Sequence, residues 1–238
     1  MIFLDIARVT LRGLVGRRRT LLMLLLAAIP ILVGLLVRAN RDGIDAVGET
    51  LDALVVRIIL PLIALVFGTA ALGSELEDGT AVHILTKPIN RATIVLAKVT
   101  VAGSLTAALV VPSTAIAALL LARPGADSGH IVALAVGTLV GSYVYAAIFV
   151  ALGVVTSRGL ILGLGYALIW EGVLAGLLPG SQVFSVREYV RGIASALSPG
   201  VLESVVGSTG FVYAAIALAV ATFIAIYRLA RFEVRGGD

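Results

Sequence analysis

The sequence predicts an all-α, polytopic membrane protein with six transmembrane helices and an N-terminal amphipathic elbow helix. Hydrophobic residues make up 60% of the 238-residue chain and charged residues only 13%, whereas soluble domains average about 45–50% and about 25%. The mean hydropathy is +1.10. The apolar residues gather in runs separated by short polar segments, and each run approaches the length of about 20 residues that an α-helix needs to cross a bilayer.

The first predicted element is an amphipathic helix over residues 2–19 that lies in the membrane interface. Charged residues recur there at steps of three and four, as at Asp5, Arg8 and Arg12, while apolar residues fill the other side. Three consecutive arginines end this segment, and the apolar run 20–37 follows. A cleaved signal peptide is the alternative interpretation, but no small-residue cleavage site closes the run, so an uncleaved first span is favoured.

The rest of the chain completes a single transmembrane domain over residues 1–238. The further predicted spans are 53–73, 93–122, 131–155, 159–178 and 209–227. Residues 180–208 are too polar to span but keep a helical apolar stripe, broken at Pro199. We expect two short helices there, at or dipping into the outer membrane interface. A gating role and an ordinary surface loop are both open for this segment.

The basic residues predict the topology. Most arginines and Lys87 fall in residues 2–19, in the segment 74–91, beside residue 158 or in the C-terminal tail. The positive-inside rule therefore places both termini and the segment 74–91 in the cytoplasm. The formal net charge of +4 is explained by this topology, so nucleic acid is not an expected partner.

Enzyme chemistry has little support in the sequence. A nucleotide-binding P-loop needs Lys followed by Ser or Thr, but Lys87 precedes Pro88 and Lys98 precedes Val99. The two histidines form no HExxH motif, GxSxG does not occur, and the chain has no cysteine. We therefore predict no catalytic, cofactor-binding or metal-binding residues on this chain.

Three ionisable residues interrupt the apolar runs. They are Arg57, Lys98 and Glu171, and a charge at the centre of a membrane helix costs about 2.5–3.5 kcal/mol. Lys98 is expected to extend to the inner membrane surface. Arg57 and Glu171 both fall in the outer halves of their spans, so a mutual ion pair between them is one expectation. Such a pair would serve either as a structural lock or as the polar lining of a transport route.

Glycines recur at four-residue spacing, which lets helix backbones approach closely. The pairs are Gly137/Gly141, Gly159/Gly163 and Gly172/Gly176. Packing within one bundle is the expected role, and a dimer seam is the alternative.

The segment 74–91, SELEDGTAVHILTKPINR, is the most informative part of the chain because it is a charged island between two long apolar runs. Pro88 limits any helix that starts near Thr80 to about two turns. Such a helix exposes Val82, Ile84 and Leu85 without a core to bury them, so it is expected to dock into another protein. The alternative is that this apolar patch lies on the membrane.

The island resembles the first cytoplasmic loop of ABC type-2 transporter permeases, particularly small bacterial permeases grouped with those of sodium efflux and nitrous-oxide-reductase maturation. The similarity covers Glu75-Leu76-Glu77-Asp78-Gly79-Thr80, Leu85-Thr86-Lys87-Pro88, Arg91 and Lys98, and the order of elements along the whole chain. Trp170-Glu171 and Tyr189 also resemble this subgroup. In that family the loop is a coupling helix that docks on a separate ATP-binding subunit.

The resemblance implies the transmembrane permease subunit of an ATP-driven exporter in a bacterial plasma membrane. ATP and Mg would be bound by the ATP-binding partner, and a second permease copy or homologue and membrane lipids would complete the assembly. The implied coupling residues are Glu75, Glu77, Asp78, Gly79, Thr80, Val82, Leu85, Thr86, Lys87 and Pro88. An ATP-independent secondary transporter or channel, and a non-transporting membrane scaffold, are the alternatives. The scarcity of aromatic and midplane charged residues favours an apolar or lipid-like cargo.

Overall fold

A computed structural model of the chain describes residues 2–39, 47–77, 90–122, 128–156, 158–174 and 180–231. All regular structure within these ranges is helical, as predicted. The helices are α1 (Ile2–Leu14), α2 (Arg17–Ala39), α3 (Val47–Leu51), η1 (Asp52–Ile59), α4 (Leu60–Glu77), α6 (Arg91–Leu121), α7 (Ser128–Val155), α8 (Gly159–Gly165), η2 (Tyr166–Leu174), η3 (Ser181–Phe184), α10 (Val186–Leu197), η4 (Gly207–Thr209) and α11 (Gly210–Ala230).

Five helices within the described residues are long and apolar enough to cross a membrane. They cover Arg18–Ala39, Val47–Leu72, Arg91–Leu121, Ser128–Val155 and Gly207–Ala230, and a shorter apolar helix covers Gly159–Leu174 at the place of the fifth predicted span. The chain is thus a multi-pass membrane protein. Its second crossing begins earlier than predicted, at Val47, because α3 and η1 continue into α4 without a break.

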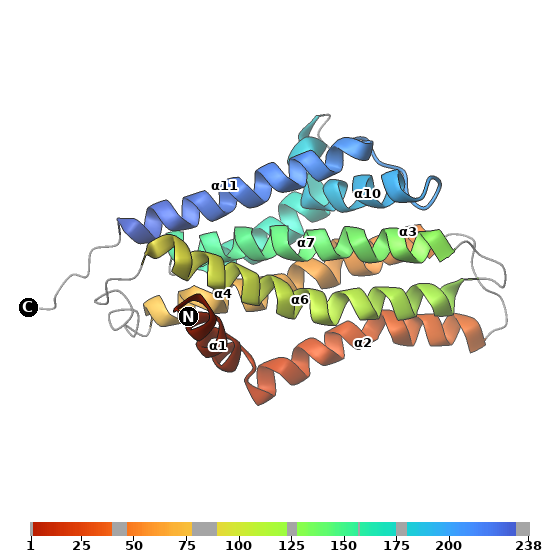
Figure 1. Cartoon of the computed structure of the whole chain (residues 1–238). Coiled ribbons are helices and arrows are strands. Elements are labelled where there is room, and N and C mark those ends of the chain that lie inside the picture. The colour runs from red at the N-terminus through yellow and green to blue at the C-terminus, as the bar shows by residue number, and fades with distance from the viewer. Residues whose placement is uncertain are drawn as a thin grey trace, which may run out of the picture.

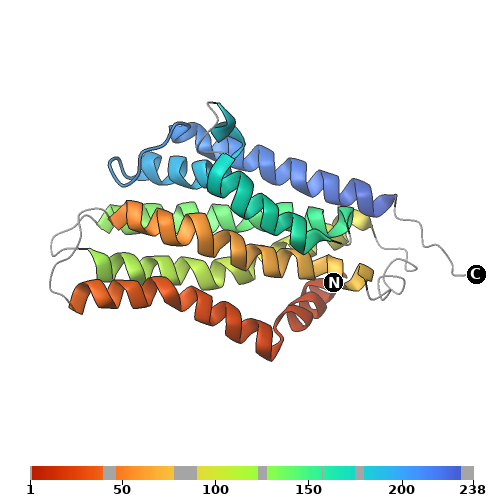
Figure 2. The same cartoon turned by 180° about the vertical axis from the view of Figure 1, so that it is seen from behind.

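The long helices lie side by side in one bundle, and α1 meets α2 at a sharp bend (Figures 1 and 2). One end of the bundle, here the proximal end, carries α1, the end of α4, the start of α6 and the end of α11. The opposite, distal end carries α3, the start of α7 and α10 (Figure 1). The two helices that flank the segment 78–89 therefore meet the elbow helix at the proximal end.

Helix α7 is the centre of the bundle, with α4, α6, α10 and α11 packed around it. Its Tyr145 and Phe149 are fully buried, and their rings stack with centroids 5.8 Å apart. By contrast α2 and α11 are peripheral, since only 22% and 28% of the most apolar stretch of each helix is buried. Their exposed leucine-, isoleucine- and phenylalanine-rich faces are suited to contact with lipid or with another membrane protein.

Two of the predicted glycine pairs pack helices within this chain. A Cβ atom on Gly141 would lie 2.6 Å from the Val190 side chain, and one on Gly137 would lie 2.9 Å from the Val190 carbonyl oxygen, so both glycines admit α10 against α7. Gly163 gives room to Leu65 and Phe149 in the same way. Among the described residues, a Cβ on Gly172 would meet only a carbonyl of its own helix at 3.7 Å, and its predicted partner Gly176 lies outside the described residues.

Two stretches of π-helix interrupt the bundle, η1 in the second crossing and η2 in the shorter fifth helix. π-Helical turns are rare and often lie at functional sites. These two stretches contain Asp52, Arg57 and Glu171, which are ionisable groups in otherwise apolar helices. Three ionisable groups of these apolar helices thus lie where the helix geometry is irregular.

Candidate functional site

The predicted coupling residues fall mostly outside the described residues. Glu75 and Glu77 lie in the last turn of α4, whereas Asp78, Gly79, Thr80, Val82, Leu85, Thr86, Lys87 and Pro88 lie in the segment 78–89 that the structure does not describe. Their role as a docking set stays a prediction. The structure does describe the helices that flank or support this segment, namely the body of α4, the start of α6 and α1, which packs on both. We call these three helices the base of the segment.

The base is tied together by polar groups. Asn90 caps α6, because its Oδ1 accepts a hydrogen bond from the backbone N–H of Ala92 at 2.9 Å. Further along α6, Lys98 is 1% exposed and its Nζ donates to the carbonyl oxygen of Ala71 at 2.5 Å. The prediction that Lys98 extends to the membrane surface is therefore wrong, because its side chain turns inward and links α6 to α4.

The elbow helix α1 packs against both α6 and α4. Thr10 and Leu14 on its inner side are buried, whereas Leu4 and Val9 are exposed. An apolar residue on the exposed side of a helix that lies beside a membrane bundle can enter the lipid interface. Helix α1 thus joins the interface to the two helices that flank the segment 78–89.

At the distal end, the carboxylate of Glu171 holds the start of α10. Glu171 is 1% exposed. Its oxygens accept hydrogen bonds from the Ser185 hydroxyl at 2.5 Å and from the Val186 N–H at 2.8 Å, with a longer one from the Arg187 N–H at 3.4 Å. The Tyr166 hydroxyl donates to it from within η2, at 3.0 Å. The first N–H groups of a helix lack intrahelical partners and favour a negative charge, so Glu171 serves as a capping anion for α10.

A second contact joins α10 to the second crossing. The guanidinium of Arg187 donates to the carboxylate of Asp52 from both Nε and Nη2, and the Nε distances are 3.2 Å. Asp52 is 4% exposed. Burial lowers the pKa of Arg187, but the hydrogen bond and charge of Asp52 outweigh it and raise that pKa overall. The Arg187 guanidinium therefore stays protonated beside Asp52.

The same side of α10 extends this network. Arg191 Nε lies 3.9 Å from Asp52 Oδ1, and Arg191 Nη1 lies 2.6 Å from Glu188 Oε1. The other oxygen of Glu188 accepts longer hydrogen bonds, at 3.4 Å, from Ser204 and from the backbone of Val205. We call Asp52, Glu171, Ser185, Arg187, Glu188 and Arg191 the distal clamp. It fixes α10 to the second crossing and to η2 at once.

The two intramembrane candidates do not form the ion pair that was one expectation. Arg57 Nη2 donates to the backbone carbonyl of Gly172, the residue after Glu171, and the Glu171 carboxylate is occupied by the clamp. The pairing is wrong because the amino end of α10 competes for Glu171. Arg57 still joins η1 to η2, through a carbonyl rather than a carboxylate.

Sequence reasoning missed Asp52 and the pairing role of Arg187. Asp52 lies one residue before the predicted second span, and Arg187 and Arg191 lie in the segment 180–208, where the sequence predicted short helices at the membrane interface. A signal was present, because two arginines four residues apart on one helix face offer a site for a single carboxylate. The partner could not be chosen from the sequence.

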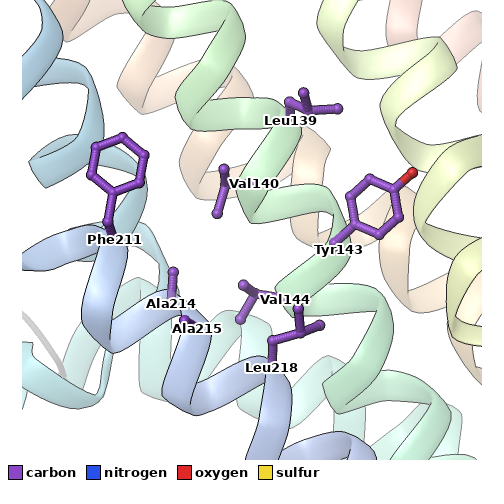
Figure 3. A pocket seen from close by; sticks show the side chains of 8 residues that line it. All are labelled: Leu139, Val140, Tyr143, Val144, Phe211, Ala214, Ala215 and Leu218. Atoms are coloured by element: carbon purple, nitrogen blue, oxygen red, sulfur yellow. The ribbon is translucent and has the colours of Figure 1, made fainter. Parts of the chain in front are cut away.

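An apolar cavity of about 350 Å³ lies between α7 and α11. Figure 3 shows the lining side chains, which come from α7 and α11: Leu139, Val140, Tyr143, Val144, Phe211, Ala214, Ala215 and Leu218. The Tyr143 hydroxyl is hydrogen bonded to Ser104 at 2.9 Å. The lining has no charged group, so this cavity is suited to hydrocarbon rather than to an ionic solute.

Comparison with known proteins gave one family match. The sequence model of a family described as "ABC-2 family transporter protein" matches residues 16–173, which is more than half of the chain. The matched range runs from the end of the elbow segment to η2 and includes the segment 74–91, Asp52, Arg57 and Glu171. A search of curated proteins found no match.

Proposed function

Because the chain belongs to the ABC-2 family of transporter proteins, we propose that it is the transmembrane permease subunit of an ATP-driven exporter. A separate ATP-binding subunit docks on the segment 74–91, and a second permease copy or homologue completes the complex. The chain itself is a membrane component without a P-loop sequence. The protein lies in a bacterial plasma membrane with both termini in the cytoplasm.

The observation that carries the proposal is the packing of α1 against both α4 and α6. These two helices flank the segment 78–89, and the Lys98 bond to Ala71 ties them together one to two turns inside the bundle. A partner that pushes on the segment would move its base as one body. Helix α1 would carry that displacement to α2, which follows it after Gly16.

The proposed mechanism follows from this mechanical continuity. Closure of two ATP-binding subunits on ATP would draw together the proximal ends of the two permease subunits. The long membrane-spanning helices would then tilt. The distal clamp joins η1, η2 and α10. When the crossings tilt, these three elements would therefore move together at the distal end. An ATP-independent channel or a scaffold would not need the coupling segment for turnover.

The topology can be tested by cysteine labelling, because the chain has no native cysteine. Single cysteines in place of Thr86 and of Val205 should label from opposite sides of the membrane with an impermeant maleimide. In intact cells the cysteine at 205, on the distal loop, is expected to react, and the cysteine at 86 only after the membrane is opened. Labelling of position 86 in intact cells would overturn the proposed orientation.

The coupling prediction is tested by placing glutamate at Val82 and Leu85 together. Losing two apolar side chains from the proposed interface would remove about 3 kcal/mol or more of binding free energy, so affinity for the ATP-binding subunit should fall by about 100-fold. The permease is co-produced with the ATP-binding subunit expected from the neighbouring reading frame. Co-purification and permease-stimulated ATP hydrolysis in proteoliposomes are then measured.

The matched control is Val205→Glu, which adds a charge to an exposed apolar residue at the distal end. It should keep both co-purification and stimulation. Retention of both properties by the Val82 and Leu85 double variant would contradict coupling through this segment. Movement of substrate without ATP would instead support the secondary-transporter alternative.

A further inference from the structure

Arg57 is an exposed cation on the membrane-spanning part of the bundle. It lies on η1 within the apolar stretch Val47–Leu72, ten residues after Val47, which is about 15 Å along the helix at 1.5 Å per residue. An arginine within a span is costly unless water or an anion reaches it. The positive charge of Arg57 at this position therefore requires a compensating group.

The described carboxylates nearby already have other partners. Asp52 is held by Arg187 and Arg191, and Glu171 accepts from Ser185 and the start of α10. No salt bridge joins Arg57 to any residue in the ranges that the structure describes. Its hydrogen bond there goes to the carbonyl of Gly172, which is neutral, so the positive charge is not balanced by these groups.

The surface around Arg57 is apolar. Ile58 is 44% exposed, Ile169 is 59% exposed and Val173 is 51% exposed, and the last two lie on η2 beside Gly172. A guanidinium has five N–H donors in a planar fork that suits two oxygens of one phosphate. A single fork of this kind set in an apolar surface is complementary to an amphiphile with an anionic head and hydrocarbon tails.

The depth of the site also suits a lipid head group. Gly172 follows Glu171, which binds the first N–H groups of α10, so Arg57 lies level with the start of that distal helix. The long arginine side chain can extend further toward the surface while its methylene groups stay in hydrocarbon. Extension of this side chain together with local thinning of the bilayer would bring a phosphate of the distal leaflet to it.

We propose that Arg57 binds the phosphate of an anionic phospholipid, whose acyl chains lie against Ile58, Ile169 and Val173. This site is separate from the apolar cavity between α7 and α11. It does not depend on the docking of an ATP-binding subunit, so its failure and that of the proposed function are distinguishable.

The chain supplies its own reporter for this site. Trp170 is the single tryptophan, it lies on η2 two residues before Gly172, and its Nε1 donates to the Phe184 carbonyl at 3.4 Å. Bromine atoms on lipid chains quench tryptophan fluorescence at short range. The full-length permease is reconstituted with phosphatidylglycerol or phosphatidylcholine brominated at the same acyl positions, and quenching of Trp170 is titrated.

Wild type is expected to prefer phosphatidylglycerol by roughly fivefold, the factor that corresponds to about 1 kcal/mol for one basic residue near an anionic membrane surface. Arg57→Gln should bring the two lipids to equal quenching, and Arg57→Lys should keep part of the preference because the charge remains. The matched control is Arg38→Gln, which removes an exposed arginine from the end of α2. That variant should keep the preference.

Several results would overturn the proposal. Equal quenching by the two lipids in wild type, or an unchanged preference in Arg57→Gln, would show that Arg57 does not select the head group. No quenching by either lipid would show that another chain, such as a second copy, covers this face. If inorganic phosphate shifts Trp170 emission in wild type but not in Arg57→Gln and displaces the brominated lipid, the ligand is a free phosphate.

Discussion

Replacing Glu171 with alanine is expected to release α10 from η2 and to lower the melting temperature of the purified permease strongly. The change leaves the Ser185 hydroxyl and the Val186 N–H without their carboxylate acceptor in a buried site. Each buried donor left without an acceptor costs about 1–3 kcal/mol, so the free energy of unfolding should fall by about 2–6 kcal/mol. Glu171→Gln should cost less because one amide oxygen can still accept.

The release of α10 from η2 is measured by the fluorescence of Trp170. Its indole N–H donates a hydrogen bond to the carbonyl of Phe184, the residue before Ser185. Its emission is expected to shift to longer wavelength in Glu171→Ala as the segment leaves η2 and water enters. Glu203→Ala is the matched control, since Glu203 is an exposed glutamate on the same distal end. Equal melting temperatures for the two alanine variants would show that Glu171 does not hold α10.

The second large effect is expected at Asp52. Asp52→Ala leaves the guanidinium of Arg187 in a partly buried position without its carboxylate and also removes the neighbour of Arg191. Breaking a buried ion pair by removing one partner costs about 3–5 kcal/mol. Arg187→Ala should cost less, because Asp52 keeps Arg191 at 3.9 Å.

A double-mutant cycle isolates this pair. The combined Asp52→Ala and Arg187→Ala variant should be more stable than the sum of the single changes predicts, by at least about 1 kcal/mol, because no charge is then stranded. Unfolding in detergent is followed by circular dichroism, with Asp5→Ala on the exposed side of α1 as the control. Additive effects would mean that the two side chains do not interact in solution.

The distal clamp explains why α10 is a fixed element rather than a loose surface helix. Its apolar residues Val186, Val190 and Ile193 are buried, and α7 makes room for Val190 at Gly137 and Gly141. Its polar residues bind the second crossing and η2. Helix α10 is therefore tied to two separate parts of the chain.

The fold was largely predictable because the bilayer restricts the choices. A backbone in hydrocarbon must satisfy its hydrogen bonds internally, so each apolar run of sufficient length is a helix. The elbow, the bundle and the helix within 180–208 follow from the apolar pattern alone. The predicted start of the second crossing was too late, because a charged residue at position 52 was expected to precede the apolar run. In the structure Asp52 lies within the helix, where its carboxylate accepts hydrogen bonds from Arg187.

The site was less predictable. Arg57 and Glu171 were found because ionisable residues stand out in apolar runs, but their partners were not. The two expected residues lie on adjacent π-helical stretches, yet Glu171 binds α10 and Arg57 binds a carbonyl. The apolar pattern is the same whether Arg57 and Glu171 pair with each other or with separate partners, so it could not predict their contacts.

The amino-acid sequence by itself determined that this chain is a helical membrane protein and that its basic residues gather toward one side, since hydrophobic length and charge are local properties of the chain. Its loop motif also indicated the family that the later comparison found. Only the tertiary structure decided that Lys98 turns inward and that Asp52 meets Arg187, 135 residues away. Contacts between distant segments depend on how helices pack side by side, and the apolar pattern of each helix leaves that lateral order open.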